Sequence, residues 1–346
     1  MPKIAIIIPL LNRHEFTERI LGYYNIYKVD YTFYLADGSK NKIFNQKKLR
    51  KQFPNIKIIY KSFPFDANYK LYAYKMLKMT KTIKSKYVYQ IANDDFFNPL
   101  FLKKAEKFLN QNKSYSMVGG IVRNIRIIQL FKPTNDHGKF YSHEKVQYHQ
   151  YKDVYKDINF NKTENRVIHF ESSLPYENVI KSSTYIKIWK LINQFQINDG
   201  FEMTWFFNIV PLLDGKKKHL NIISTVRQSN TYKGLGMIEM FSGASKKRFF
   251  EFLKFLQYKN IIKSKIIIKK LKNTSDASID VLDNKSTFGK KNSRKKIYFP
   301  VYLIFKETIL KINYIFTYIF FYFYRNKYQS IYLKIHTIFN HRKNKL

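Results

Sequence analysis

The strongest constraint on the fold is a regular alternation of two kinds of segment over the first 125 residues. Short runs of β-branched and aromatic residues, typical of buried strands, are separated by stretches in which apolar residues recur at helical spacing. The strand-like runs are KIAIIIPL, YTFYLAD, IKIIYK, KYVYQIA and MVGGIV. One helical stripe is formed by Phe16, Ile20, Tyr23, Tyr24 and Tyr27. This alternation predicts an α/β fold with a mainly parallel central sheet covered by helices on both faces.

Polar clusters follow three of the predicted strands, at the point where each strand ends. In sheets of this kind, ligands bind in the crevice beyond the carboxyl ends of the strands. We therefore expect the three clusters to meet at one edge of the sheet and to form the functional site. They are Asn12-Arg13, Asp37-Gly38-Ser39 and Asn93-Asp94-Asp95.

The acidic couplet Asp94-Asp95 is unusual in a chain with 63 Lys and Arg residues but only 24 Asp and Glu residues. Adjacent carboxylates at a strand end either hold a hard divalent cation or cap the next helix. Asn98-Pro99 already supplies a cap and a first-turn proline for a helix over Leu100–Leu109. Two like charges this close also repel unless a cation lies between them. The couplet is thus predicted to bind a cation, with a solvated structural pair as the alternative.

Three of these segments resemble a known family when they are taken in order. IAIIIPLLNR, LADGS and YVYQIANDDFF are similar to motifs in the nucleotide-sugar domain of GT-A glycosyltransferases, family 2 in the broad sense. The finer resemblance is to a bacterial subgroup with DGS, DDDF-like and RQSN-like motifs, and it covers roughly residues 1–235. It implies a GT-A (Rossmann-like) fold and a hexosyltransferase-like activity that uses a nucleotide-sugar donor.

The resemblance implies donor-binding roles for residues in the first half of the chain. Pro9, Asn12 and Arg13 match the loop beside the base and ribose, and Asp37 matches the acid that contacts the base. Asn68 stands where family members carry a polar residue over the nucleotide. In the DxD-like motif, Asp95 would bind the metal, Mg²⁺ or Mn²⁺, while Asn93 or Asp94 would meet the ribose or sugar. Asn93 departs from the acid usual at that position.

Residues in the second half match the catalytic part of the family pattern. Glu202 stands at the position of the general base, and Asp199 is the second candidate. Arg227 and Lys233 resemble the cations of a late loop that close over the diphosphate. A cation beside the leaving diphosphate and one carboxylate for the acceptor hydroxyl suffice for a single displacement. Because no enzyme nucleophile is needed, we expect inversion at the anomeric carbon.

Two further segments are predicted to lack regular structure. Residues 126–185 contain His137, His143 and His149 without helical metal-ligand spacing, which favours a solvated, loop-rich insertion. Thr225–Gly236 is typical of a flexible loop. Between them, helical patterning over Tyr185–Leu213 contains both tryptophans. We divide the chain into a catalytic domain over 1–240, a Lys-rich helical extension and linker over 241–296, and a tail over 297–346.

The tail and the overall charge indicate an anionic partner. Residues 297–324 are rich in Tyr and Phe, but their longest uncharged run, Ile312–Tyr324, is too short to span a bilayer. We expect an in-plane helix or hairpin on an anionic membrane surface, with a buried helix as the alternative. No signal-peptide cleavage site follows the first apolar run, and the chain has no cysteine. These features predict a cytoplasmic enzyme on the inner face of the membrane, acting on a glycan or a lipid-linked acceptor.

Other classes of protein explain part of the pattern. The formal net charge of +39 suits nucleic acid, but no nucleic-acid-binding motif is present and the basic residues are spread along the chain, so no specific nucleic acid is expected. A nucleotidyltransferase would open with a Gly-rich phosphate loop, and PLLNRHEF has no glycine. A non-catalytic membrane-bound scaffold is the remaining alternative.

Overall fold

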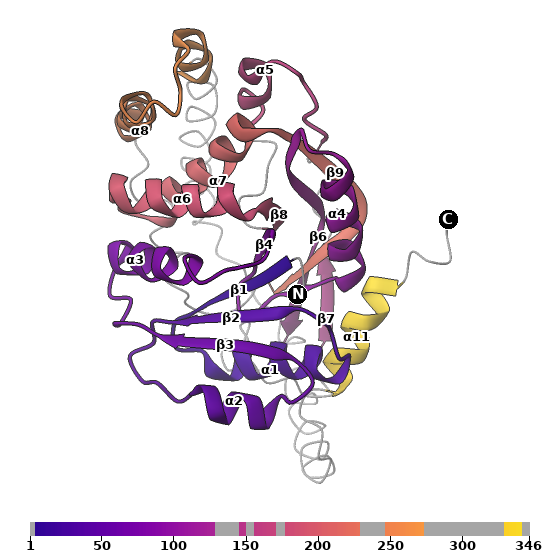
Figure 1. The fold of residues 1–346 in the computed structure, drawn as a ribbon. Helices are drawn as coiled ribbons and strands as arrows, with labels where there is room; N and C mark the ends of the chain where they lie inside the picture. The colour runs from indigo at the N-terminus through magenta and orange to yellow at the C-terminus, as the bar shows by residue number, and fades with distance from the viewer. Residues whose placement is uncertain are drawn as a thin grey trace, which may run out of the picture.

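A computed structural model describes residues 4–128, 145–149, 156–170, 177–228, 246–272 and 329–340. Its centre is a nine-stranded sheet with the order β3-β2-β1-β4-β8-β6-β9-β5, and β7 pairs with β6 outside this path (Figure 1). The strands are β1 (Ile4–Leu10), β2 (Thr32–Asp37), β3 (Lys57–Ser62), β4 (Tyr87–Gln90), β5 (Phe96–Phe97), β6 (Tyr115–Ile128), β7 (Lys145–His149), β8 (Asn178–Lys181) and β9 (Lys216–Gln228).

The sheet is mainly parallel. Strands β3, β2, β1 and β4 are parallel neighbours, and β6 and β9 are parallel to each other. The antiparallel strand β8 lies between β4 and β6, so these two strands also run in the same direction. Strands β5 and β7 are antiparallel to β9 and β6. The α/β fold class with a mainly parallel sheet is therefore confirmed.

Helices cover both faces of the sheet because its central strands are apolar on both sides. In β1, Ile4, Ile6 and Ile8 enter one core cluster, while Ala5 and Ile7 enter the other. The first cluster is closed by α1 (His14–Ile26), α2 (Gln46–Gln52), α4 (Pro99–Gln111) and α11 (Gln329–Asn340). The second is closed by α3 (Tyr69–Thr80), α5 (Thr163–Val167), α6 (Ser182–Phe195), α7 (Gly200–Asp214) and α8 (Lys246–Tyr258).

Two predictions of irregular structure were wrong for the residues that the structure describes. The segment over 126–185 contains the end of β6, β7, α5 and β8, and β8 is inserted in the middle of the sheet. Of the loop predicted over Thr225–Gly236, residues 225–228 form the last part of β9 instead, and residues 229–236 lie outside the described ranges. The four residues of β8 are too few to display a strand period. The lysines that open β9 suggest a solvated segment, although Lys217 is buried and its burial lowers its pKa to about 7.

The basic C-terminal region is helical where the structure describes it. It contains α8, a helix over residues 265–272, and α11. Helix α11 packs on α1: the Tyr332 hydroxyl donates to the backbone oxygen of Arg19 over 2.7 Å, and the rings of Tyr27 and His336 stack at 4.7 Å. The apolar run over 297–324 lies outside the described residues. None of the described helices combines the length and apolarity needed to cross a bilayer.

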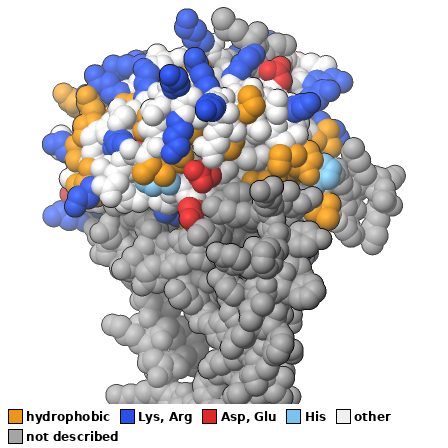
Figure 2. Space-filling view, turned by 90° about the horizontal axis from the view of Figure 1, so that it is seen from below, with side chains coloured by type: hydrophobic (Ala, Val, Ile, Leu, Met, Phe, Trp, Pro, Cys, Tyr) orange, Lys and Arg blue, Asp and Glu red, His pale blue; other side chains and the backbone are white. Residues whose placement is uncertain are grey.

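The face formed by α1, α2 and α11 is basic with apolar groups among the charges. Seen from below, Lys and Arg side chains are numerous there and apolar side chains lie between them (Figure 2). Exposed apolar residues here include Ile26 at the end of α1, the Tyr27 that follows it, and Leu333 of α11.

Candidate active site

The three polar clusters come together at the carboxyl ends of β1, β2 and β4, which are neighbours in the sheet. The backbone N–H of Asn12 donates to Ser39 Oγ over 2.7 Å, which joins the first cluster to the second. The Arg13 guanidinium donates to Asp94 Oδ2, also over 2.7 Å, which joins the first cluster to the third. Parallel strands bring these side chains together because their ends share one edge of the sheet.

Local backbone geometry places the first two loops. Asn12 and Arg13 both adopt left-handed conformations, with φ of 53° and 59°, so the chain turns sharply from β1 into α1. Gly38 is required for another reason: a Cβ at this position would overlap the carboxylate of Asp66. The loop after β2 can therefore approach Asp66 only as glycine.

Asp37 and a second acid lie buried beneath this edge. Asp37 accepts from the backbone N–H of Ser39 and from the Tyr60 hydroxyl, each over 2.8 Å. Asp66 makes a fully buried ion pair with Lys75, which also donates to the backbone oxygen of Leu10 over 3.0 Å. Burial raises the pKa of Asp66 and lowers the pKa of Lys75. The pair therefore ties α3 to the end of β1.

The acidic couplet lies between two arginines. Asp94 pairs with Arg13, while Asp95 accepts from the backbone N–H of Gln228 over 3.1 Å and lies 3.8 Å from Nε of Arg227. Burial and, to a lesser extent, the neighbouring Asp94 carboxylate raise the pKa of Asp95 to about 8, against the opposing effect of Arg227. Carboxyl groups with a pKa this strongly perturbed cluster at functional sites.

Asn93 has a structural partner on α1. Its side-chain amide donates to the backbone oxygen of Arg13 and to Thr17 Oγ1, each over 3.2 Å. The amide group thus fixes the strand end to the first turn of α1. An acid at this position could not donate these two hydrogen bonds.

Both candidates for the general base, Asp199 and Glu202, make capping contacts at the start of α7. Asp199 is the N-cap, and its Oδ1 accepts from the backbone N–H of Glu202 over 2.8 Å. Glu202 is 1% exposed, accepts from the backbone N–H of Asn198 over 3.0 Å, and pairs with Arg248 at 2.7 Å. A carboxylate held in this way can accept a proton only after Arg248 moves.

A cleft of about 200 Å³ opens beside the joined loops. Of the predicted site residues, Pro9, Arg13 and Asn93 line it. Helix α7 contributes Met203 to the lining, and not its acidic neighbour Glu202. The full lining is Pro9, Leu10, Leu11, Arg13, Tyr69, Tyr72, Lys75, Ala92, Asn93 and Met203.

The remaining predicted residues have different placements. Asn68 is exposed and caps α3, since its side chain accepts from the backbone N–H of Leu71 over 3.0 Å. Arg227 lies at the end of β9 beside the couplet. Lys233 lies outside the described residues.

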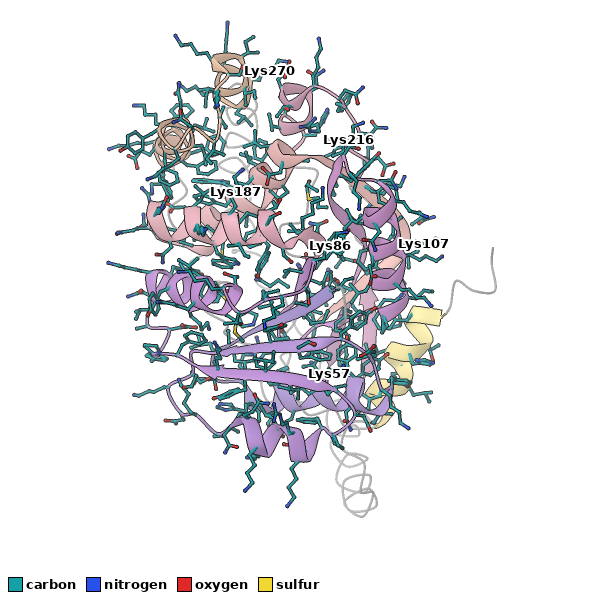
Figure 3. The ribbon with its side chains drawn as sticks, in the orientation of Figure 1. Lys57, Lys86, Lys107, Lys187, Lys216 and Lys270 are labelled. Atoms are coloured by element: carbon teal, nitrogen blue, oxygen red, sulfur yellow. The ribbon has the colours of Figure 1, made fainter. Side chains whose placement is uncertain are left out.

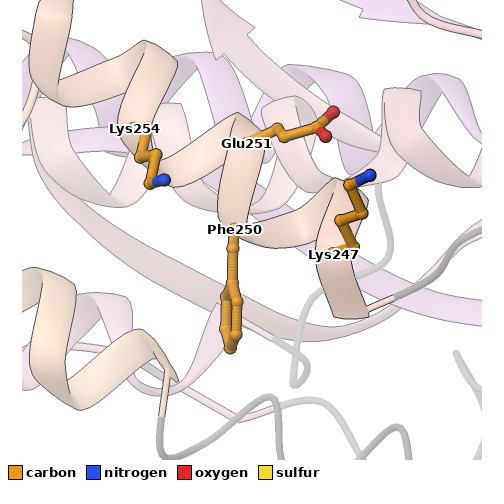
Figure 4. Close-up of a pocket in the computed structure, with 4 residues that line it drawn as sticks. All are labelled: Lys247, Phe250, Glu251 and Lys254. Atoms are coloured by element: carbon orange, nitrogen blue, oxygen red, sulfur yellow. The ribbon is translucent and has the colours of Figure 1, made fainter.

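A second hollow, of about 400 Å³, lies along α8 and is lined by Lys247, Phe250, Glu251 and Lys254 (Figure 4). It contains none of the predicted site residues.

Two site residues were missed by sequence reasoning. Glu177, just before β8, is buried and pairs with Arg227. Arg19 is fully buried in α1; it donates to the backbone oxygen of Asp94 over 3.0 Å and to Gln228 Oε1 over 2.9 Å. Its guanidinium carbon also lies 4.9 Å from the ring centre of Phe16. No local motif distinguishes either residue from a surface charge.

The donor set suits a hard divalent cation that arrives with its own oxygen ligands. Within the described ranges, no group of three or more His, Cys, Asp or Glu side chains is placed to hold a metal. Magnesium, however, is usually held by one or two carboxylates together with substrate phosphates. Asp95 and Asp94 are the carboxylates that would hold such an ion here, and a cation would relieve the repulsion between them.

No protein-family model matches the chain, and no curated protein matches it. Among solved structures, the fold is similar to residues 1–349 of S. aureus TarS, with a TM-score of 0.48, 11% identity and coverage of 79% of this chain and 71% of that one. The same fragment in complex with UDP-GlcNAc gives a TM-score of 0.46 and 12% identity, with coverage of 74% of this chain and 66% of that one. For the longer S. aureus TarS chain, the TM-score is 0.44 and the identity 11%. The match covers 74% of this chain but only 39% of that one, so this chain spans well under half of its length. These values describe the path of the chain and carry no information about its chemistry.

Proposed function

We propose that this protein is a glycosyltransferase that moves a sugar from a nucleotide-sugar donor to an acceptor hydroxyl. The observation that carries the proposal is the meeting of three loops, at the ends of β1, β2 and β4, around a buried carboxylate couplet that lies between Arg13 and Arg227. A buried pair of acidic side chains edged by guanidinium groups suits a ligand that brings a divalent cation and a diphosphate together. The motif resemblance points to the same class of ligand.

The donor would be held by residues of the adjoining loops. Asp37 and the turn at Asn12 and Arg13 would face the base and ribose, Asn68 would lie over the nucleotide, and Asp94 would meet the ribose or sugar. Asp95 would hold Mg²⁺ or Mn²⁺, which neutralises charge on the diphosphate when bound. Arg227, 35% exposed at the rim, would contact the diphosphate as it leaves, with Lys233 in the same role.

Glu202 is the proposed base for a single, inverting displacement, with Asp199 as the second candidate. It would take the proton of the acceptor hydroxyl as that oxygen attacks the anomeric carbon and the nucleoside diphosphate departs. In the free protein Arg248 holds this carboxylate. We infer that the acceptor-bound form requires the Arg248 contact to open.

One observation favours a second function, that of a non-catalytic nucleotide-sugar-binding scaffold. The first turn of α7 presents Met203 to the cleft, while both acids of that turn are engaged in capping contacts and ion pairs. Such a protein would bind the donor with no turnover. The two functions therefore differ in hydrolysis and transfer, and not in binding.

A donor panel separates these two functions. Purified full-length protein is incubated with UDP-, GDP- and CMP-linked sugars, with and without Mn²⁺ or Mg²⁺, and both binding and release of the free nucleotide are measured. Asp95→Asn should abolish turnover of the active donor, whereas Asp157→Asn, which changes an acid paired with Lys218 on the surface, should not. Binding without release would favour the scaffold. Failure to bind any donor would refute both functions.

The acceptor and the location follow from the basic surface. We propose a glycan or lipid-linked acceptor, with the protein held at the anionic inner face of the cell membrane by its tail over 297–346. Within the described ranges, lysines are spread over many elements: those labelled in Figure 3 belong to segments as distant as β3, α4, α6 and the 265–272 helix. This distribution suits a broad anionic surface better than a specific nucleic-acid site.

Point substitutions test the membrane proposal better than truncation does. Deleting the whole tail would also remove Tyr332 and Ile335, which are buried in the core. Ile315→Glu with Ile319→Glu should instead weaken sedimentation with vesicles that contain phosphatidylserine, while the melting temperature stays the same. Unchanged sedimentation would remove this run from the membrane contact.

A further inference from the structure

Arg227 lies between two buried carboxylates at the end of β9. Its Nε is 3.8 Å from Asp95 Oδ2, and its guanidinium pairs with Glu177. Asp95 is 5% exposed and Glu177 is 4% exposed, but the Arg227 side chain is 35% exposed. The cation thus reaches solvent, while its two anionic partners do not.

Glu177 has no other means of compensating its charge within the described part of the chain. Its Oε2 is buried and has no hydrogen-bond partner there, and its Oε1 faces Arg227. A buried carboxylate is strongly unfavourable unless a cation or a set of donors accompanies it. Glu177 therefore holds Arg227 close to the couplet, and Arg227 serves both acids at once.

We propose that Arg227 is an internal counter-ion of this site, anchored by Glu177, and that a divalent cation binds Asp95 only by displacing it. A metal ion on Asp95 and a guanidinium about 4 Å from the same carboxylate would repel each other, so one excludes the other. The displaced guanidinium would stay tethered at the rim by Glu177, where it can contact an anionic group of a ligand. The nature of that ligand rests on the proposed function, but the competition is a property of the free protein.

The test measures Mn²⁺ binding to the free, full-length protein, with no nucleotide present, from the electron paramagnetic resonance signal of unbound Mn²⁺. Arg227→Met removes the counter-ion and should tighten Mn²⁺ binding about fivefold, which corresponds to the coupling of about 1 kcal/mol typical of partly exposed charges. Arg227→Lys keeps the charge and should bind Mn²⁺ nearly as the unmodified protein does.

Lys218→Met is the matched control. Lys218 belongs to the same strand, has a similar exposure of 31% and pairs with Asp157 at 2.7 Å. It lies nine residues before Arg227, or about 30 Å along an extended strand. The Lys218→Met substitution changes the net charge by the same amount as Arg227→Met does, and it should leave the Mn²⁺ affinity unchanged. Equal tightening in both variants would attribute the effect to net charge and overturn the proposal.

Two other results would overturn the inference. One is an Arg227→Met affinity within twofold of the unmodified protein, with an unchanged circular dichroism spectrum. The other is the absence of Mn²⁺ binding in every variant, which leaves the proposed function open to the separate donor-binding test.

The anchoring of Arg227 by Glu177 is tested by melting temperatures. Because Glu177 and Arg227 form a pair, the decreases in melting temperature of Glu177→Gln and Arg227→Met should sum to more than the decrease of the double variant. Additive shifts would remove Glu177 from the proposal.

Discussion

Replacing Asp95 by asparagine should stabilise the protein, and the gain should grow with pH. Burial and the adjacent Asp94 raise the pKa of Asp95 from 3.8 to about 8. Between these two values the folded protein binds more protons at Asp95 than the unfolded chain does. The free energy of unfolding therefore falls as pH rises through this window, and an amide removes that loss.

The size of the effect follows from the shift. About four pKa units at 1.36 kcal/mol each give an upper limit of about 5 kcal/mol at pH 8 and above. The amide must replace the contacts that Asp95 makes with the backbone of Gln228 and with Arg227. We therefore expect about half of this limit, or roughly 2–3 kcal/mol, at pH 8. Near pH 4 the two proteins should have nearly equal stability.

Urea unfolding followed by the fluorescence of Trp189 and Trp205 provides the measurement, at pH values from 4 to 9 with a chelator present. Asp157→Asn serves as the control, since an exposed pair with Lys218 contributes at most about 1 kcal/mol. The reasoning would be refuted if the difference in free energy of unfolding between Asp95→Asn and the unmodified protein stayed constant across the pH range. So would a variant that is less stable at pH 8, because then the carboxylate would stabilise the fold.

Three further substitutions test other parts of the structure. Gly38→Ala should lower the free energy of unfolding by about 2 kcal/mol, measured in urea, because the added Cβ overlaps the carboxylate of Asp66; no loss would mean that this loop shifts freely. Lys217→Met should raise the melting temperature most at low pH. Burial lowers the pKa of Lys217 from 10.5 to about 7, so the unmodified protein gains stability as the pH rises between these two values, and the substitution gains less there. A rise in melting temperature that is equal at pH 6 and pH 10 would contradict this. Arg248→Met should destabilise the protein by about 3 kcal/mol because it leaves Glu202 buried without its cation; Arg248→Met with Glu202→Gln should recover part of that loss, and a double variant no more stable than the single one would argue against the pair.

The first half of the fold was predictable because its signals are local. Buried parallel strands are apolar on both faces, and the polar residues that follow them mark the strand ends. The predicted cap at Asn98 and the first-turn proline of α4 are confirmed, since Asn98 Oδ1 accepts from the backbone N–H of Leu100 over 3.0 Å. The meeting of Asn12, Asp37 and Asp94 at one edge follows from strand order alone.

The second half depends on contacts between distant parts of the chain, which no local pattern contains. Arg19 has the spacing of an ordinary helix cation, but it is buried because it bonds Gln228, 209 residues away. Glu177 gains its importance from Arg227, which comes from another strand. The residues that carry charge at this site were thus only partly identifiable, since burial and pairing are decided by the tertiary structure.

The hydrogen bond from Tyr332 to the backbone of Arg19 joins residues 313 positions apart. During synthesis on the ribosome, α1 must therefore wait for α11 before its outer side is covered. Contacts of such long range form late, since loop closure must precede them. The nascent chain would expose aromatic residues of α1 throughout most of translation, a period in which a chaperone or the membrane itself could occupy that side.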